Sequence, residues 1–261
     1  MTRYRFLLRP RWLLFHLVVV TAVVAMVNLG FWQLRRLDER QAFNATVEAR
    51  IDQPPVPLGD LLPTGATTDG DLSALEWRPV TTAGAYVPGE TITVVNKSQG
   101  GIAGSFVVTP LRLDDERILL VERGFVPLSE ASTPPAPTGT VEVTGRLRPS
   151  QERQRGGLSD PADGDLAEVQ RIDIGRLAIQ IPGDVLPMYV ELTSSRPAEA
   201  GPLPLPIARP ELADGPHLSY AGQWFIFAIA VVVGWVLAVR HSVASRRNPH
   251  PPPEARAAPD G

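Results

Sequence analysis

The chain has no cysteine among its 261 residues. That absence excludes disulfide bonds, thiolate catalysis, cysteine-ligated zinc and iron–sulfur clusters. Histidine is missing from residues 33–216, so a Ser-His-Asp triad would have to recruit a residue from outside this long middle stretch. The chain also lacks a phosphate-binding glycine loop, an H-E-x-x-H motif and a dinucleotide-binding fingerprint. We therefore expect a protein that is not an enzyme.

Two long stretches lack Asp, Glu, Lys and Arg, namely residues 12–32 and residues 218–239. Each has about 20 residues, enough for a helix to cross roughly 30 Å of hydrocarbon. A cleavable signal peptide is the alternative for the first stretch. Its apolar run, however, exceeds the roughly 7–15 residues of such a peptide, and no clean A-x-A site follows. The sequence predicts two transmembrane helices, at 12–32 and 218–239.

Basic residues indicate the orientation of these helices. They are Arg3, Arg5, Arg9 and Arg11 before the first stretch, and Arg240, Arg246 and Arg247 after the second. The positive-inside rule therefore predicts that residues 1–11 and the tail 240–261 are cytoplasmic. Three arginines just after the first stretch argue the other way, although two acidic residues lie among them.

The N-terminal segment also bears on the compartment. The eleven residues before the first apolar stretch are too few for a mitochondrial transit peptide. We expect a bacterial plasma membrane, with residues 33–216 outside the cytoplasm. The tail is rich in proline from Asn248 onward, and we expect it to be disordered.

The middle of the chain, residues 33–216, has the pattern of a β-rich domain. Residues 34–51 continue the first helix as a stalk, because apolar residues recur among charges. Runs rich in β-branched residues, separated by Gly, Pro and Asp, then predict strands. The predicted strands are 80–86, 91–96, 105–111, 118–123, 140–147 and 188–193. We expect a small, barrel-like antiparallel β domain.

The connections of this domain are predicted from their composition. Residues 52–71 and 151–167 are expected to be loops, 171–181 a short helix, and 197–216 an extended tether. Asp114-Asp115-Glu116 resembles a general acid/base cluster, but it lies between two strands and is better interpreted as a solvated hairpin tip. The acidic excess of the domain argues against a nucleic-acid partner.

The candidate site lies where the second apolar stretch begins. His217, Tyr220 and Trp224 are spaced i, i+3, i+7, which places an imidazole, a phenol and an indole on one helix face at the outer membrane boundary. Neutral imidazole is an axial ligand of haem iron. Aromatic rings can pack on the macrocycle, and Arg35 or Arg36 can pair with its propionates.

Ordinary membrane anchoring is the alternative for these residues. Trp and Tyr form the interfacial aromatic belt of many membrane proteins, and a histidine there can simply bind head groups. His16, inside the first stretch, is a second iron ligand, a residue that faces the other helix, or a residue that snorkels to the membrane surface.

Small residues predict how the two helices pack. Ala230, Gly234 and Ala238 form a small-xxx-small stripe, and Thr21 with Ala25 forms a shorter one. Such packing would bring Trp32 to the same membrane depth as His217, which adds Trp32 to the candidate site. The alternative is that the stripe packs against another membrane protein.

Four motifs carry a resemblance to a known family. Residues 28–37, NLGFWQLRRL, resemble the LGxWQLxR motif of the Surfeit locus protein family. Residues 101–111 are similar to the central hairpin region of that family, and residues 122–127, ERGFVP, to its NRGWVP motif. Residues 217–225, HLSYAGQWF, are similar to its HxxYAxQWF motif. Glu122 and Phe125 depart from the usual Asn and Trp.

The resemblance implies a function. It implies an assembly factor for haem–copper cytochrome c oxidase that acts when haem a is placed in subunit I, with His217 contacting the haem transiently. The expected partners are therefore oxidase subunit I, the haem a synthesis machinery and the lipid bilayer. The alternative is a cofactor-free scaffold that binds oxidase subunits through the β domain and the helix pair.

Overall fold

The computed structural model describes residues 2–63, 72–130 and 133–246. The chain folds as two compact units. One combines the N-terminal residues up to Asn44 with the C-terminal residues from Leu212, and the other comprises Ala45–Glu211. The tail predicted to be disordered, from Asn248 onward, lies outside the described residues.

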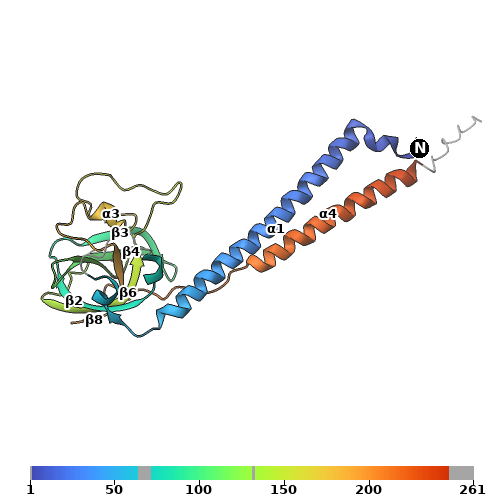
Figure 1. Ribbon diagram of the computed structural model, residues 1–261. Helices are drawn as coiled ribbons and strands as arrows, with labels where there is room; N and C mark the ends of the chain where they lie inside the picture. The colour runs from blue at the N-terminus through green and yellow to red at the C-terminus, as the bar shows by residue number, and fades with distance from the viewer. Residues whose placement is uncertain (1, 64–71, 131–132, 247–261) are drawn as a thin grey trace, which may run out of the picture. The chain divides into compact units, whose positions relative to one another are not determined.

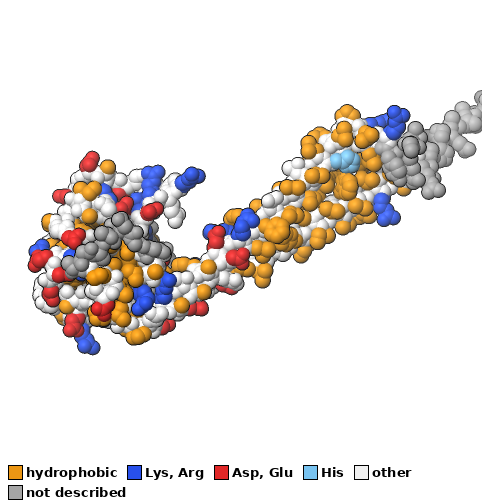
Figure 2. Space-filling view, in the orientation of Figure 1, with side chains coloured by type: hydrophobic (Ala, Val, Ile, Leu, Met, Phe, Trp, Pro, Cys, Tyr) orange, Lys and Arg blue, Asp and Glu red, His pale blue; other side chains and the backbone are white. Residues whose placement is uncertain are grey.

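The first unit is a pair of long helices. A short 3₁₀ helix, η1 (Thr2–Leu8), precedes α1 (Pro10–Ile51), and α4 (His217–Ser245) lies alongside α1 (Figure 1). Both helices are long and apolar enough to cross a membrane, and only 6% of the apolar window of each is buried. Hydrophobic side chains cover the middle of the visible face of the pair, and charged side chains gather toward its ends (Figure 2). The helices therefore present to their surroundings the apolar surface expected from the sequence.

The contact between α1 and α4 follows alternating steps of four and three residues. Side chains that are at least partly buried recur along both helices in this rhythm, which is typical of left-handed helix pairs. They include Trp12, His16, Val19, Val23, Met26, Gly30 and Gln33 on α1, and His217, Ala221, Trp224, Ala228, Val231 and Trp235 on α4.

The predicted small-residue stripes do not form this contact as whole stripes. Ala230 and Gly234 are exposed, as are Thr21 and Ala25, and only Ala238, three residues after Trp235, is partly buried. Ala230 follows the buried Ala228 by two residues, which turns it about 200° around the helix, away from α1. The helix pairing is confirmed, but the face predicted for it was wrong. That the stripe packs against another membrane protein stays a prediction.

The second unit is built on an eight-stranded mixed sheet. Its strands are β1 (Val56–Pro57), β2 (Pro79–Tyr86), β3 (Ile92–Gln99), β4 (Ile102–Leu113), β5 (Ile118–Pro127), β6 (Thr140–Pro149), β7 (Glu168–Val169) and β8 (Met188–Arg196). Their order is β1-β2-β6-β8-β5-β4-β3-β7, and an additional pairing of β2 with β4 closes a ring of five strands. All six strands predicted from β-branched runs are present.

The sheet differs from the predicted one in strand direction. Most pairs are antiparallel, but β1–β2, β3–β7 and β5–β8 are parallel. The hairpin between β4 and β5 turns at the exposed residues 114–116, as predicted. The parallel pairs join strands that are distant in sequence, and nothing in the local pattern of a strand specifies such a partner.

Several short elements complete this unit. The predicted loop 52–71 contains β1 and a short helix, α2 (Leu58–Leu61). The 3₁₀ helix η2 (Leu72–Leu75) follows. The predicted helix 171–181 is present as α3 (Ile174–Leu177), whose N-cap Asp173 accepts a hydrogen bond from the Arg176 amide.

Two hydrophobic clusters cover opposite faces of β5. Alternate side chains of a strand point to opposite faces, so Val121 joins a cluster drawn from all five ring strands, whereas Leu120 joins a second cluster with β3 and α3. Consequently β5 is buried along nearly its whole length. It is the strand that carries the ERGFVP motif.

Candidate functional site

His217 is the first residue of α4 and contacts α1 directly. Its Nδ1 lies 2.9 Å from Oε1 of Gln33, and its side chain is half-buried. Gln33 belongs to the same motif as Trp32 and Arg35 but was not singled out from the sequence. A hydrogen bond between residues 184 positions apart therefore joins the two helix motifs.

The predicted aromatic residues divide between two sides of the helix pair. Trp224 lies two turns after His217 on the partly buried side. Tyr220 and Trp32 instead expose 47% and 46% of their surface. The single face of imidazole, phenol and indole expected from the spacing is thus split: His217 and Trp224 share it, and Tyr220 lies beside it.

The two candidate arginines are both exposed. Arg36 forms an ion pair with Glu39 at 2.7 Å, one helical turn further along α1. Arg35 forms no ion pair within the described part of the chain. Arg35 is therefore the better candidate for an incoming carboxylate.

The segment that leads into α4 is anchored on α1 by polar side chains. Asn44 donates to the Leu212 carbonyl at 2.8 Å and to Asp214 at 3.1 Å. Gln41 donates to Asp214 at 3.0 Å, and Arg40 donates to the Ala213 carbonyl at 3.1 Å. These contacts determine where α4 begins, and with it the position of His217.

Close approach of the helices is made possible by Gly30. A Cβ added there would lie 2.7 Å from the ring of Phe225, well inside van der Waals contact. Phe225 also stacks edge-on against Phe31, with ring centroids 5.5 Å apart.

His16 faces the partner helix at the other end of the pair. Its Nδ1 accepts a hydrogen bond of 2.9 Å from Nε1 of Trp235. This contact agrees with the interpretation in which His16 faces the other helix.

The β-domain motif places a buried carboxyl group at Glu122. Glu122 on β5 is in register with Glu191 on β8, and both side chains are buried. Burial, together with the neighbouring Glu191, raises the pKa of Glu122 to about 8. Burial also raises the pKa of Glu191, although Arg146 and Arg148 act in the opposite direction. Arg146 Nη1 lies 3.2 Å from Glu191 Oε1, an ion pair that is not aligned as a hydrogen bond.

The next residue of the motif, Arg123, ties two loops to the barrel. Its guanidinium is fully buried, pairs with both carboxylate oxygens of Glu199, and donates to the carbonyls of Pro134 and Pro135. Phe125 is completely buried, and its backbone pairs with Leu205 in both directions at 2.8 Å. These contacts give the motif a structural role, and its two departures, Glu122 and Phe125, are both buried on a central strand.

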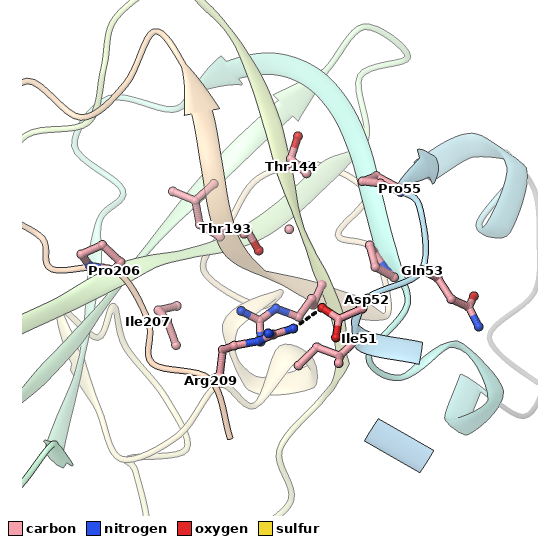
Figure 3. Close-up of a pocket in the computed structure, with 13 residues that line it drawn as sticks. Ile51, Asp52, Gln53, Pro55, Thr144, Thr193, Pro206, Ile207 and Arg209 are labelled. Carbon is pink, nitrogen blue, oxygen red and sulfur yellow. Dashed lines mark hydrogen bonds and ion pairs between the residues drawn. The ribbon is translucent and has the colours of Figure 1, made fainter. Parts of the chain in front are cut away.

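A cavity of about 520 Å³ lies on the barrel beside β6 and β8. Asp52 and Arg209 form an ion pair across it, and Thr144 and Thr193 extend from the strands beside it (Figure 3). None of the site residues predicted from the sequence lines this cavity.

These features define a class of protein in which two helices, long and apolar enough to cross a membrane, flank a mixed β-sheet domain. An imidazole stands at the start of the second helix. In the described residues no group of three or more His, Cys, Asp or Glu is placed to hold a metal ion.

Comparison with known proteins identifies the family. The model of the SURF1 family matches residues 20–229, so the chain belongs to that family. It is 32% identical to an uncharacterised SURF1-like protein of Mycobacterium bovis, over 97% of this chain and 94% of that protein. It is also 27% identical to a SURF1-like protein of Monosiga brevicollis, over 94% of this chain and 93% of that protein. The resemblance to the Surfeit locus family is therefore confirmed over nearly the whole chain.

Proposed function

We propose that this protein is a membrane-bound assembly factor for haem–copper cytochrome c oxidase that assists the insertion of haem a into subunit I. Membership of the SURF1 family supports the assembly role. The observation that carries the haem proposal is the placement of His217 at the start of α4, held against α1 by Gln33. The proposal assigns no catalytic residue to the chain.

The donor groups around His217 fit a haem. Imidazole is an established ligand of haem iron, and a bound haem would supply that iron. His217 would hold the iron, Trp224 and the exposed rings of Tyr220 and Trp32 would offer aromatic surface, and Arg35 would offer charge for a propionate. The chain's own part is to orient the imidazole, through the contact of His217 with Gln33.

The proposal includes a location. α1 and α4 cross a bacterial plasma membrane, both termini are cytoplasmic, and the β domain lies outside. The arginines at the terminal ends of both helices support this orientation. Haem a would then be met at the outer boundary of the bilayer, with subunit I and the haem a synthesis machinery as neighbours.

The test is an optical spectrum of detergent-purified protein from cells that also make haem a. We expect a haem a absorbance that His217→Ala largely removes. His241→Ala is the matched control, because His241 is an exposed histidine near the far end of α4, and it should leave the absorbance unchanged. Haem-free wild-type protein that still co-purifies with oxidase subunits would overturn the haem proposal in favour of the cofactor-free scaffold.

A further inference from the structure

The two histidines of the helix pair are bonded to opposite kinds of partner. His217 Nδ1 meets the amide oxygen of Gln33, which can only accept a hydrogen bond. His16 Nδ1 meets the indole N–H of Trp235, which can only donate. The proton of each neutral ring is therefore assigned by a side chain of the other helix.

The consequence differs between the two rings. In His217 the proton must lie on Nδ1, which leaves the lone pair of Nε2 available. In His16 Nδ1 is the acceptor, so the proton of the neutral ring lies on Nε2. A metal ligand needs a free lone pair, and the hydrogen bond at the other ring nitrogen fixes which nitrogen has one. The helix pair therefore leaves a free lone pair on Nε2 of His217, whereas neither ring nitrogen of His16 has one.

A glycine lies in the backbone next to the Nε2 edge of His217. Gly215 has a φ of +73°, which favours glycine, and a Cβ built on it would lie 3.5 Å from both Nε2 and Cδ2 of His217. Any other residue at this position would place a carbon against the nitrogen that carries the free lone pair. The hydrogen bonds of Asn44 and Gln41 to Leu212 and Asp214 fix the path of the chain into this glycine.

From these contacts we infer that Gln33 and Gly215 are positioning residues for haem ligation by His217: Gln33 selects the Nδ1–H tautomer, and Gly215 leaves Nε2 accessible. This inference rests on the proposed function for its ligand. The assignment of the two tautomers does not rest on the proposed function, because the hydrogen bonds exist without haem. His16 is assigned the opposite tautomer and is not a second axial ligand while Trp235 remains bonded to it.

The tautomers are tested by ¹⁵N NMR of the imidazole rings in detergent-solubilised, haem-free protein. His217→Ala and His16→Ala identify the two sets of signals. We expect a protonated Nδ1 and an unprotonated Nε2 in His217, and the reverse in neutral His16. In Gln33→Leu the His217 signals should move toward the tautomer mixture of a free imidazole, whereas Gln33→Glu, which keeps an acceptor, should preserve them at a pH high enough for the ring to be neutral. Unchanged His217 signals in Gln33→Leu overturn the inference.

Ligation is tested by titrating iron protoporphyrin IX into the same preparations and following the Soret band. Gln33→Leu should weaken binding about 10–100-fold, as is usual when the partner of a ligating histidine is lost. Gly215→Ala should weaken it while leaving the wild-type tautomer signals in place, which separates access from tautomer choice. Full affinity in both variants overturns the inference even if His217 binds haem. Undiminished binding in His217→Ala instead overturns the proposed function and leaves the NMR result standing.

Discussion

At the scale of single residues, the barrel unit holds a carboxyl group that is costly to ionise. Glu122 has a pKa of about 8 because it is buried beside Glu191, whereas an unfolded chain would give it an ordinary value near 4.5. Between these two values the folded protein keeps the proton that the unfolded chain loses. The free energy of unfolding therefore falls as the pH rises from about 4.5 to about 8. The stability associated with protonated Glu122 is fully present below this range and is lost above it.

Replacing Glu122 by Gln should remove this pH dependence. We expect E122Q to match the wild type near pH 4 and to exceed its stability by a few kcal/mol, roughly 2–5, above pH 8. The measurement is thermal or denaturant unfolding of the solubilised protein at several pH values. Glu142→Gln, an exposed carboxyl group on β6, is the control and should run parallel to the wild type. An E122Q curve that is also parallel would contradict the buried-carboxyl account.

The sequence singled out His217 as a candidate site residue but gave no indication of its partner Gln33. The spacing from His217 to Trp224 and the flanking apolar run indicated a site at the start of α4. Gln33 carries no comparable signal, because an amide among charged residues does not reveal a partner 184 residues away. For the same reason Arg123 could not be matched to Glu199 before the loops were placed.

At the scale of elements, the pairing of α1 with α4 depends on a missing side chain. Gly30 lies directly against Phe225, and the helices approach each other there because no Cβ intervenes. Gly234 is the opposite case, since a Cβ at that position would meet nothing within 4 Å. Gly30 and Gly234 both lie within long helices, but only Gly234 has room for a larger side chain.

Gly30→Val should loosen the helix pair, whereas Gly234→Val should not. We expect Gly30→Val to lower the melting temperature of the solubilised protein, with a cost of about 1–3 kcal/mol that is typical of overpacking. Combining it with Phe225→Ala should cost less than the sum of the two single changes, because the truncated ring leaves room for valine. Equal losses in the Gly30 and Gly234 variants would argue that α1 and α4 pack through another face.

The positions of most helices and strands were predictable from the sequence, but which strands pair and which helix faces meet were not. β-branched runs between Gly, Pro and Asp located six strands, because that pattern reflects a strand's own burial. The parallel pairing of β5 with β8 and the closure between β2 and β4 depend on contacts between distant segments. The stripe of Ala230 and Gly234 misled for a related reason, since small residues indicate where a helix can approach but not which helix does so.

At the scale of the whole molecule, the proposed topology places both terminal tails in the cytoplasm and the β domain on the other side of the membrane. A reporter that is active only in the cytoplasm should work when fused after Ser245, and one active only outside should work when inserted in the exposed loop at residues 153–157. Reversing the tail charge with Arg240→Glu and Arg246→Glu should weaken this orientation. An externally active fusion after Ser245 would exclude the orientation proposed here.

The place of β8 in the ring affects how the chain is made. β8 is the last strand in sequence, yet it lies between β6 and β5. During synthesis the ring therefore stays open until residues 188–196 have emerged, and the unsatisfied edges of β5 and β6 are until then available to any other strand. A chain interrupted before Met188 would hold every hairpin of the barrel and still be unable to close it. The edges of β5 and β6 are thus the part of the barrel most open to wrong pairing until the last strand is in place.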